Sequence, residues 1–225
     1  MKIEAVVFDM DGLMFDTETL IAGYIEKTLI EFGYNIHNFL DWGYRYVIGN
    51  RPDKKEQNMR ELLKIDLDWG AFWKRMLFFY EQHIKIQGIK KKKGLDNLLN
   101  FLKENNIKTA IASSSPKKFI ELVCNSAGIS LNSFDCVVAG EDVTQSKPHP
   151  EIYQVACKKL KVAPEKAIAL EDGDYGIMSA SSAGMLPVLI PDIKINDEST
   201  DKLIFKTIKS LDEVIDIIKD LINGR

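Results

Sequence analysis

Cysteine is scarce in this chain of 225 residues, and its three cysteines argue against a disulfide framework. Their number is odd, and no pair has the Cys-x-x-Cys spacing found in many zinc and redox sites. We therefore expect a reducing compartment, with each thiol buried as a small apolar side chain. The three are Cys124, Cys136 and Cys157.

Long apolar runs and a strong charge excess are also missing. No run approaches the roughly 20 residues that span a bilayer, and the first residues resemble a strand instead of a signal peptide. A net charge of -3 gives no general attraction to nucleic acid or anionic membranes. The one basic cluster, Lys90–Lys93, has no interleaved aromatic residues, which favours a solvated linker over a binding patch. We expect a soluble cytoplasmic protein with no nucleic-acid or membrane partner and no evident obligate protein partner.

What the chain does contain is an alternation of strand-like and helix-like segments. Short apolar, β-branched runs are separated by amphipathic helical patterns, which predicts an α/β fold with a parallel sheet and helices on both of its faces. The expected strands are 3–8, 108–112, 136–139, 167–170 and 186–190. The expected helices between the later strands are 95–104, 116–127, 150–160 and 173–183.

One stretch breaks this alternation. From about residue 16 to residue 87 the pattern is helical and contains no convincing strand. Of the 21 aromatic residues, 13 lie between residues 16 and 88, which favours the core of a helical module over a substrate pocket. We therefore predict a core made of residues 1–15 and 89–225, with an inserted helical unit at 16–88.

Polar clusters follow four of the expected strands. In a parallel α/β sheet, ligands bind outside the carboxyl ends of the strands, so the fold should bring these clusters to one edge. In chain order they are Asp9 and Asp11, then Ser113–Ser115, then Lys147, then Glu171, Asp172 and Asp174.

These residue types suit phosphoryl transfer. A phosphate monoester repels a carboxylate nucleophile unless a divalent cation neutralises both. Magnesium prefers oxygen ligands and takes one or two carboxylates, which Asp9 and Asp172 can supply. Lys147 can add a fixed positive charge, and a strand-end serine can donate hydrogen bonds to the phosphate oxygens. Asp11, two residues past Asp9, can exchange a proton with the leaving oxygen and with water.

Each cluster also has a purely structural explanation. Asp-x-Asp-Gly is a common turn, and serines before a proline often cap a helix. The Lys147-Pro148 pair fits a surface turn, and acidic residues favour the start of a helix. Their joint occurrence in this order, each after a strand, favours the functional interpretation.

Four segments resemble the motifs of the haloacid dehalogenase superfamily. The first runs from Phe8 to Glu18 and contains Asp9-Met10-Asp11-Gly12, and the second is Ala112–Ser115. The third is Lys147-Pro148 followed by Pro150. The fourth is Glu171–Ile177 with Ala183-Gly184-Met185. The resemblance covers nearly the whole chain and is greatest to the subgroup of β-phosphoglucomutase and phosphoglycolate-type phosphatases.

The resemblance implies a Rossmann-like core with an inserted helical cap, and an aspartyl-phosphate intermediate. It makes Asp9 the nucleophile and Asp11 the general acid and base. Ser113, Ser114 and Lys147 would bind the phosphate. Mg²⁺ would be held by Asp9, the main-chain carbonyl of Asp11 and Asp172, with Glu171 close by.

The expected function is a magnesium-dependent phosphatase of a small phosphorylated metabolite, such as a sugar phosphate. The alternative is a phosphosugar mutase of the β-phosphoglucomutase type. Ile21 stands where that mutase has a histidine, and Arg51 matches its cap arginine only loosely, so both lower the mutase interpretation. A dehalogenase is disfavoured because Asp11 would have no leaving oxygen to protonate. A catalytically silent binding protein need not keep Asp9, Asp11, Lys147 and Asp172 together.

Two further expectations concern the motifs and the cap. Family members often have Ser or Thr where Gly173 stands, which removes a hydroxyl but no proposed metal ligand. The residues that select the leaving group should lie in the cap. Candidates are Tyr24, Trp42, Tyr44, Tyr46 and Arg51.

Overall fold

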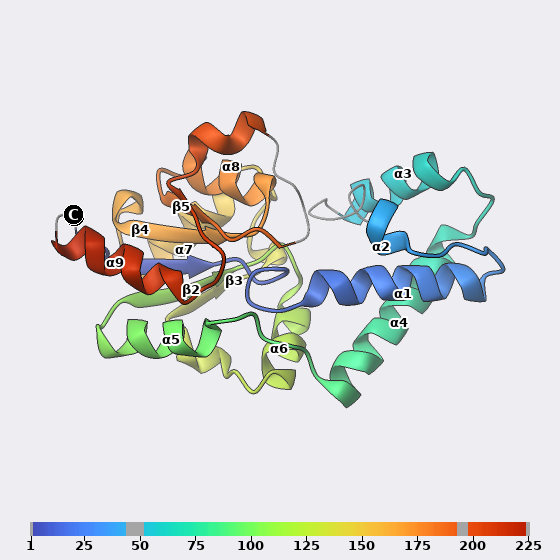
Figure 1. Cartoon of the computed structure of the whole chain (residues 1–225), viewed down its shortest axis with the longest axis horizontal. Helices are drawn as coiled ribbons and strands as arrows, with labels where there is room; N and C mark the ends of the chain where they lie inside the picture. Colours follow the sequence, from blue (N-terminus) through green and yellow to red (C-terminus); the bar gives the residue numbers. More distant parts are fainter. Residues whose placement is uncertain (1, 44–51, 193–197, 224–225) are drawn as a thin grey trace.

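A parallel sheet forms the centre of the larger group of elements, and the inserted helices lie beside that group (Figure 1). The computed structural model describes residues 2–43, 52–192 and 198–223. Within them, six parallel strands lie in the order β3-β2-β1-β4-β5-β6. They are β1 (Ala5–Phe8), β2 (Lys108–Ala112), β3 (Cys136–Val138), β4 (Ala167–Glu171), β5 (Leu186–Leu189) and β6 (Lys206–Thr207). This confirms the predicted fold class and all five expected strands. The short edge strand β6 was not predicted.

Helices cover both faces of the sheet. The helices α7 (Glu151–Leu160) and α8 (Asp174–Ser182) pack on the face that includes Ala5 and Val7 of β1. The opposite face, with Val6 and Phe8, belongs to the core that also contains α5 (Leu95–Glu104), α6 (Lys117–Ser126) and α9 (Glu213–Asn223). Because β1 is buried on both sides, its sequence is a continuous apolar run instead of an alternating one.

The predicted helices of the core differ from the observed ones by a residue at most at each end. The helices α6, α7 and α8 begin one residue later than expected, after Pro116, Pro150 and Gly173. Those residues are the N-caps, whose backbone is only half inside the helix. The C-terminal helix α9 lies beyond the last predicted element.

Four helices occupy the described part of the inserted stretch: α1 (Thr17–Glu31), α2 (Phe39–Trp42), α3 (Pro52–Leu63) and α4 (Trp69–Gln87). Figure 1 shows them as a separate group beside the sheet, with α1 continuing from the end of β1. One face of α4 is buried at intervals of three or four residues, as in a helical core. That face consists of Trp69, Phe72, Met76, Tyr80 and Ile84. Three of these five residues are aromatic, so helix packing accounts for that part of the aromatic enrichment, whereas Trp42 and Phe78 are exposed.

The two connections between the core and the inserted helices lie side by side. Phe15 and Lys91 form an isolated antiparallel bridge. On either side of it, Asp16 N donates to the Lys90 carbonyl at 2.9 Å and Lys92 N donates to the Met14 carbonyl at 2.9 Å. The insertion therefore leaves and re-enters the core at one point.

The side chain of Lys92 is not a solvated one. Its Nζ lies 2.5 Å from Asp192 Oδ1 in the loop after β5, and 3.8 Å from Asp16 Oδ1 in the first connection. The interpretation of the lysine run as a simple solvated linker is therefore wrong for Lys92. Its partner in the core is 100 residues away in the sequence, which local patterns do not reveal.

Two expectations from composition can be checked directly. Cys124 and Cys157 are buried, but Cys136 is only half-buried because it lies on the edge strand β3. The expectation that all three thiols are buried is wrong for Cys136. Among the described helices, none has both the length and the apolar character needed to cross a membrane.

Candidate active site

Strand register brings the predicted clusters together. Phe8, the last residue of β1, pairs with Ile111 of β2 and with Leu170 of β4, so β2 and β4 end one residue beyond β1. Asp9 follows β1, and Glu171 is the last residue of β4. The strand order reverses direction at β1, and ligands of such sheets bind in the crevice at that point.

Lys147 is the centre of the site. Its buried ammonium donates to Asp9 Oδ1 at 2.5 Å, to Glu171 Oε1 at 2.7 Å and to the Ala112 carbonyl at 3.0 Å. Burial would lower the pKa of Lys147, but the carboxylates of Asp9 and Glu171 outweigh it and hold the pKa above its usual value. Lys147 is therefore a permanent cation whose three N–H groups all have partners.

Negative charge at this edge exceeds what one lysine can balance. Burial raises the pKa of Asp9 well above its usual value, Lys147 opposes this rise, and Glu171 adds to it. Burial likewise raises the pKa of Asp172, with Asp9 and Glu171 adding to the effect. Oxygens of Asp9, Glu171 and Asp172 lie within 4.8 Å of one another. Such a group of carboxylates is stabilised by a bound cation.

The donor set fits magnesium. The three carboxylates offer oxygen ligands only, and a hard divalent cation prefers oxygen to nitrogen or sulfur. No histidine or cysteine belongs to this group as found among the described residues. Asp9 and Asp172 were the predicted carboxylate ligands, and their separation is compatible with one shared ion.

Asp11 faces the serines that follow β2. Ser115 Oγ donates to Asp11 Oδ2 at 2.8 Å, and Ser113 Oγ lies 3.4 Å from the same oxygen. Ser113 is buried and its Oγ also accepts from Ser115 N at 3.1 Å. Ser114 is exposed, and no hydrogen bond of its hydroxyl is found within the described ranges. Of the three serines, Ser115 makes the shortest hydrogen bond to Asp11, and it was not predicted as a site residue. The sequence alone does not show which of three adjacent serines faces Asp11.

Gly12 allows the first loop to approach Asp172. Its φ of +80° is in the left-handed region, and a Cβ there would overlap Asp172 Oδ2. The Gly12 N–H lies 3.0 Å from Thr17 Oγ1, which ties the loop to the start of α1. Position 12 therefore requires glycine for two reasons: the backbone conformation, and the lack of space for a side chain beside Asp172.

We expect Gly12→Ala to impair both folding and metal binding. The unfavourable φ should cost roughly 1–3 kcal/mol, and the methyl group should displace the Asp172 carboxylate. Gly173→Ser is the matched control, because Gly173 has φ -149° and nothing lies within 4 Å of an added Cβ. Thermal unfolding and Mg²⁺ titration should separate the two variants. Equal behaviour of both would contradict this account of Gly12.

Tyr153 is a site residue that sequence reasoning missed. It lies on α7, is fully buried, and its hydroxyl donates to Glu171 Oε1, the oxygen that also accepts from Lys147. Burial, reinforced by the Glu171 charge, raises the pKa of Tyr153 well above its usual value, so the hydroxyl stays a neutral donor. An aromatic residue at an apolar helix position indicates core packing, so the sequence does not show that the Tyr153 hydroxyl contacts Glu171.

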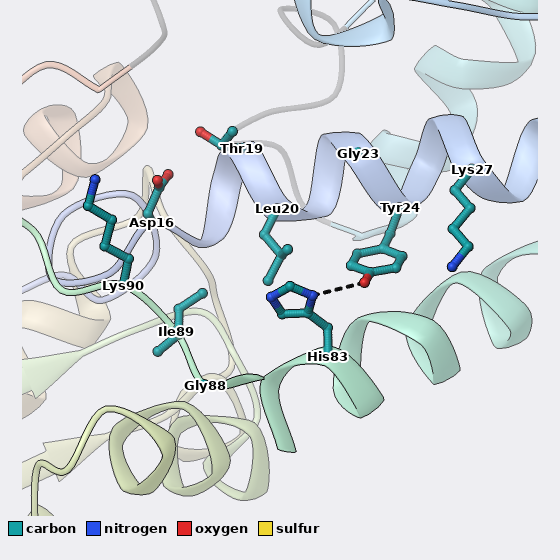
Figure 2. Close-up of a pocket in the computed structure, with 10 residues that line it drawn as sticks. All are labelled: Asp16, Thr19, Leu20, Gly23, Tyr24, Lys27, His83, Gly88, Ile89 and Lys90. Atoms are coloured by element: carbon teal, nitrogen blue, oxygen red, sulfur yellow. Dashed lines mark hydrogen bonds between the residues drawn. The ribbon is translucent and has the colours of Figure 1, made fainter. Parts of the chain in front are cut away.

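A groove of about 420 Å³ lies between α1, α4 and the second connection (Figure 2). Tyr24 and His83 join the two helices across it by a hydrogen bond of 2.9 Å. Asp9, Asp11, Lys147 and Asp172 are absent from its lining, so it is not the chemical site. The residues that line it are Asp16, Thr19, Leu20, Gly23, Tyr24, Lys27, His83, Gly88, Ile89 and Lys90.

Two of the five residues predicted to select the leaving group belong to the described part of the chain. Tyr24 belongs to the groove just described, and Trp42 Nε1 donates to the His37 carbonyl at 3.0 Å at the surface. Neither side chain is among the contacts of the Asp9 cluster. Tyr44, Tyr46 and Arg51 lie outside the described residues.

Known proteins resemble this chain in sequence and in fold. Residues 6–190 match the family of haloacid dehalogenase-like hydrolases. The chain is 32% identical over 186 residues to the phosphorylated carbohydrates phosphatase of Thermotoga maritima, which covers 81% of this chain and 82% of that protein. The crystal structure of β-phosphoglucomutase from Clostridium difficile has a TM-score of 0.75 at 25% identity, covering 99% of this chain and 100% of that one. CbbY from Rhodobacter sphaeroides, in complex with phosphate, shares the fold with a TM-score of 0.77 at 24% identity, covering 94% and 96%.

Proposed function

Because the chain belongs to the haloacid dehalogenase-like hydrolases, we propose that it is a magnesium-dependent phosphatase that works through an aspartyl-phosphate intermediate. Its substrate is a small phosphorylated metabolite of the sugar-phosphate class. The observation that carries the proposal is the contact of Lys147 with Asp9, beside the Asp172 carboxylate. A carboxylate nucleophile, a fixed cation and a second oxygen ligand are the parts that phosphoryl transfer requires.

Asp9 attacks the phosphorus atom and the ester oxygen leaves. A new bond forms between the Asp9 carboxylate and phosphorus while the bond to the leaving oxygen breaks, and Asp11 gives that oxygen its proton. Asp11, now ionised, then takes a proton from water as the water oxygen attacks the phosphoryl group. This second step releases inorganic phosphate and restores Asp9. The hydrogen bond from Ser115 to Asp11, at 2.8 Å, supports this role by orienting the carboxyl group.

The phosphate oxygens need positive charge and hydrogen-bond donors. Lys147 supplies the positive charge. Ser113 and Ser114, which follow β2, supply hydrogen-bond donors to the phosphate oxygens. Asp9, the main-chain carbonyl of Asp11 and Asp172 would hold Mg²⁺. Bound there, the ion would neutralise the repulsion between nucleophile and phosphate and polarise the phosphoryl group.

Residues 16–88 act as a cap that covers Asp9 and contacts the leaving group. The first helix of this stretch, α1, begins soon after the end of β1, and Asp9 follows β1 directly (Figure 1). The two adjacent connections at Phe15 and Lys91 suit a hinge. The groove between α1 and α4 adjoins that hinge and would change shape as the cap moves.

A substrate panel tests the proposal. Phosphorylated sugars, nucleotides and small phosphorylated acids should be offered to the purified protein with Mg²⁺, and phosphate release measured. We expect the highest kcat/KM on a phosphorylated carbohydrate, since the relative from Thermotoga maritima carries that name. A chelator should abolish activity and added Mg²⁺ should restore it, because two carboxylates and a phosphate otherwise repel one another.

The same panel distinguishes a phosphatase, which transfers the phosphoryl group to water, from a mutase, which transfers it back to the sugar. A sugar bisphosphate should lose phosphate to water; its conversion into an isomeric sugar phosphate would make the protein a mutase instead. Release of phosphate from none of the esters, or full activity in metal-free buffer, would contradict the proposal.

A further inference from the structure

The inserted helices also contact the core through α4 and α6. The C-terminal half of α4 lies beside α6, which belongs to the core (Figure 1). In this contact the rings of Tyr80 on α4 and Phe119 on α6 have centroids 5.6 Å apart and planes at 30°. Gly88 follows α4 and lies at the other end of α6, because an added Cβ would be 3.2 Å from the Ser126 carbonyl oxygen. Tyr80 is only 3% exposed, so it is buried between the insertion and the core.

The hydroxyl group of Tyr80 lies close to the loop that carries Asp11. Its oxygen is 3.5 Å from the Thr17 carbonyl oxygen at the start of α1. The Oγ1 atom of Thr17 accepts from Gly12 N at 3.0 Å, and Gly12 directly follows Asp11. Burial raises the pKa of Tyr80 well above its usual value, and the Asp11 charge adds to the rise, so the hydroxyl stays a neutral donor.

The ring of Tyr80 contacts the helix that follows the serines. Phe119 lies in the first turn of α6, four residues after Ser115. Ser115 Oγ donates to Asp11 Oδ2 at 2.8 Å, so the serine loop and the Asp11 loop meet at this hydrogen bond. Tyr80 reaches the serine loop through Phe119 and the Asp11 loop through Thr17. The contacts therefore form a closed circuit that contains both loops.

We propose that Tyr80 is a positioning residue for Asp11: it holds the Asp11 loop and the serine loop together, and so sets the direction from which Asp11 gives a proton to the leaving oxygen. The inference rests on the proposed function, in which Asp11 is the general acid. Tyr80 acts on Asp11 through Phe119 and Thr17.

A displaced general acid has a recognisable effect on the reaction. Proton transfer to the leaving oxygen requires Asp11 within hydrogen-bond reach, and such catalysis contributes roughly 10²–10⁴-fold. The alkoxide of a sugar is a poor leaving group that needs this proton, whereas nitrophenolate is stable enough to leave without it. Misplacement of Asp11 should therefore slow the hydrolysis of a sugar phosphate far more than that of a nitrophenyl ester. Partial unfolding would slow both equally.

Tyr80→Leu tests this inference, because it removes the ring and the hydroxyl but keeps a buried apolar side chain. With Mg²⁺ present, kcat/KM should be measured on a sugar phosphate that the unaltered protein hydrolyses and on p-nitrophenyl phosphate. We expect kcat/KM to fall about tenfold on the sugar phosphate and less than about twofold on the nitrophenyl ester. Phe119→Leu should change the ratio of the two values in the same direction. Since Phe119 is only half-buried, this second variant tests the contact even if Tyr80→Leu does not fold.

Phe72→Leu is the matched control. Phe72 is a buried aromatic residue on the same face of α4, but its ring neighbours all belong to the inserted helices. Those neighbours are Phe32, Trp69 and Trp73. The substitution should lower the unfolding temperature and leave the ratio of the two kcat/KM values unchanged. An equal change of the ratio in Phe72→Leu and Tyr80→Leu would show a general loosening of the inserted helices and would overturn the inference.

A second background shows whether Tyr80 acts through Asp11. Asp11→Asn should itself lower kcat/KM on the sugar phosphate more than on the nitrophenyl ester, and adding Tyr80→Leu should not lower the ratio further. A further fall as large as in the unaltered protein would mean that Tyr80 acts elsewhere, and the inference would fail.

The outcomes separate this inference from the proposed function. If the unaltered protein hydrolyses neither ester, the proposed function and the role of Tyr80 fail together. If it hydrolyses both and Tyr80→Leu and Phe119→Leu leave the ratio unchanged, the role of Tyr80 alone fails.

Discussion

Asp9→Asn should lower kcat by on the order of 10⁴-fold or more, as removal of a nucleophile does in other covalent mechanisms. The amide keeps the shape of the carboxyl group but cannot attack phosphorus as an anion. The fold should survive, because burial makes the Asp9 charge costly and Glu171 still pairs with Lys147 at 2.7 Å. Steady-state kinetics and thermal unfolding measure the two quantities.

The matched control for this loss is Asp96→Asn. Asp96 pairs with Lys91 at 2.6 Å, but its side chain is 59% exposed and lies on α5. Its substitution should leave kcat unchanged. Near-normal turnover in Asp9→Asn would rule out Asp9 as the nucleophile, and loss of activity in both variants would point to a general effect of lost charge.

Lys147→Met should damage both catalysis and stability. It leaves Asp9 and Glu171 buried as like charges without their cation, which costs about 3–5 kcal/mol when one partner of a buried pair is removed. Loss of the positive charge at the phosphate should lower kcat by about 10²–10³-fold, as for other preorganised donors. Urea unfolding and steady-state kinetics on the folded fraction measure the two effects.

The stability defect should depend on pH with a definite sign. Without Lys147, the pKa of Asp9 in the folded state lies further above its unfolded value, so protonation relieves the repulsion. The defect should therefore be largest at about pH 8 and shrink towards about pH 5. Lys166→Met, which breaks an exposed pair with Glu4 at 2.8 Å, is the control and should change little at either pH. A defect of Lys147→Met that is independent of pH would contradict the charge argument.

Much of the site could be predicted because strand ends obey a strict rule. Carboxyl ends of parallel strands meet at one edge, so Asp9 and Lys147 could be expected to meet although they are 138 residues apart in the sequence. The hydrophobic runs that define the strands are local signals. The absence of strand-like segments between the inserted helices is also a local signal. The helical spacing of apolar residues in α4, beginning at Trp69, is a local signal too.

The parts that could not be predicted depend on side-chain direction. Ser114 and Ser115 are adjacent in sequence, yet the orientation of the loop after β2 decides that Ser115 faces Asp11. Tyr153 fits an ordinary core position, and only the position of Glu171 reveals its hydroxyl as a functional group. The pairing of Lys92 with Asp192 depends on how the β5 loop meets the connection, which no repeating pattern encodes.

The paired connections at Phe15 and Lys91 also affect the entropy of the whole chain. Ala5 of β1 pairs with Lys108 of β2, so the strand pair closes a loop on the order of 100 residues long. When the inserted helices are folded and their ends are joined, the flexible part of that loop shortens to roughly 30 residues. The cost of closing a loop grows with the logarithm of its length, so the difference is about 1 kcal/mol. Folding of the insertion thus stabilises the sheet through chain connectivity alone, and folding of the sheet stabilises the insertion by the same amount.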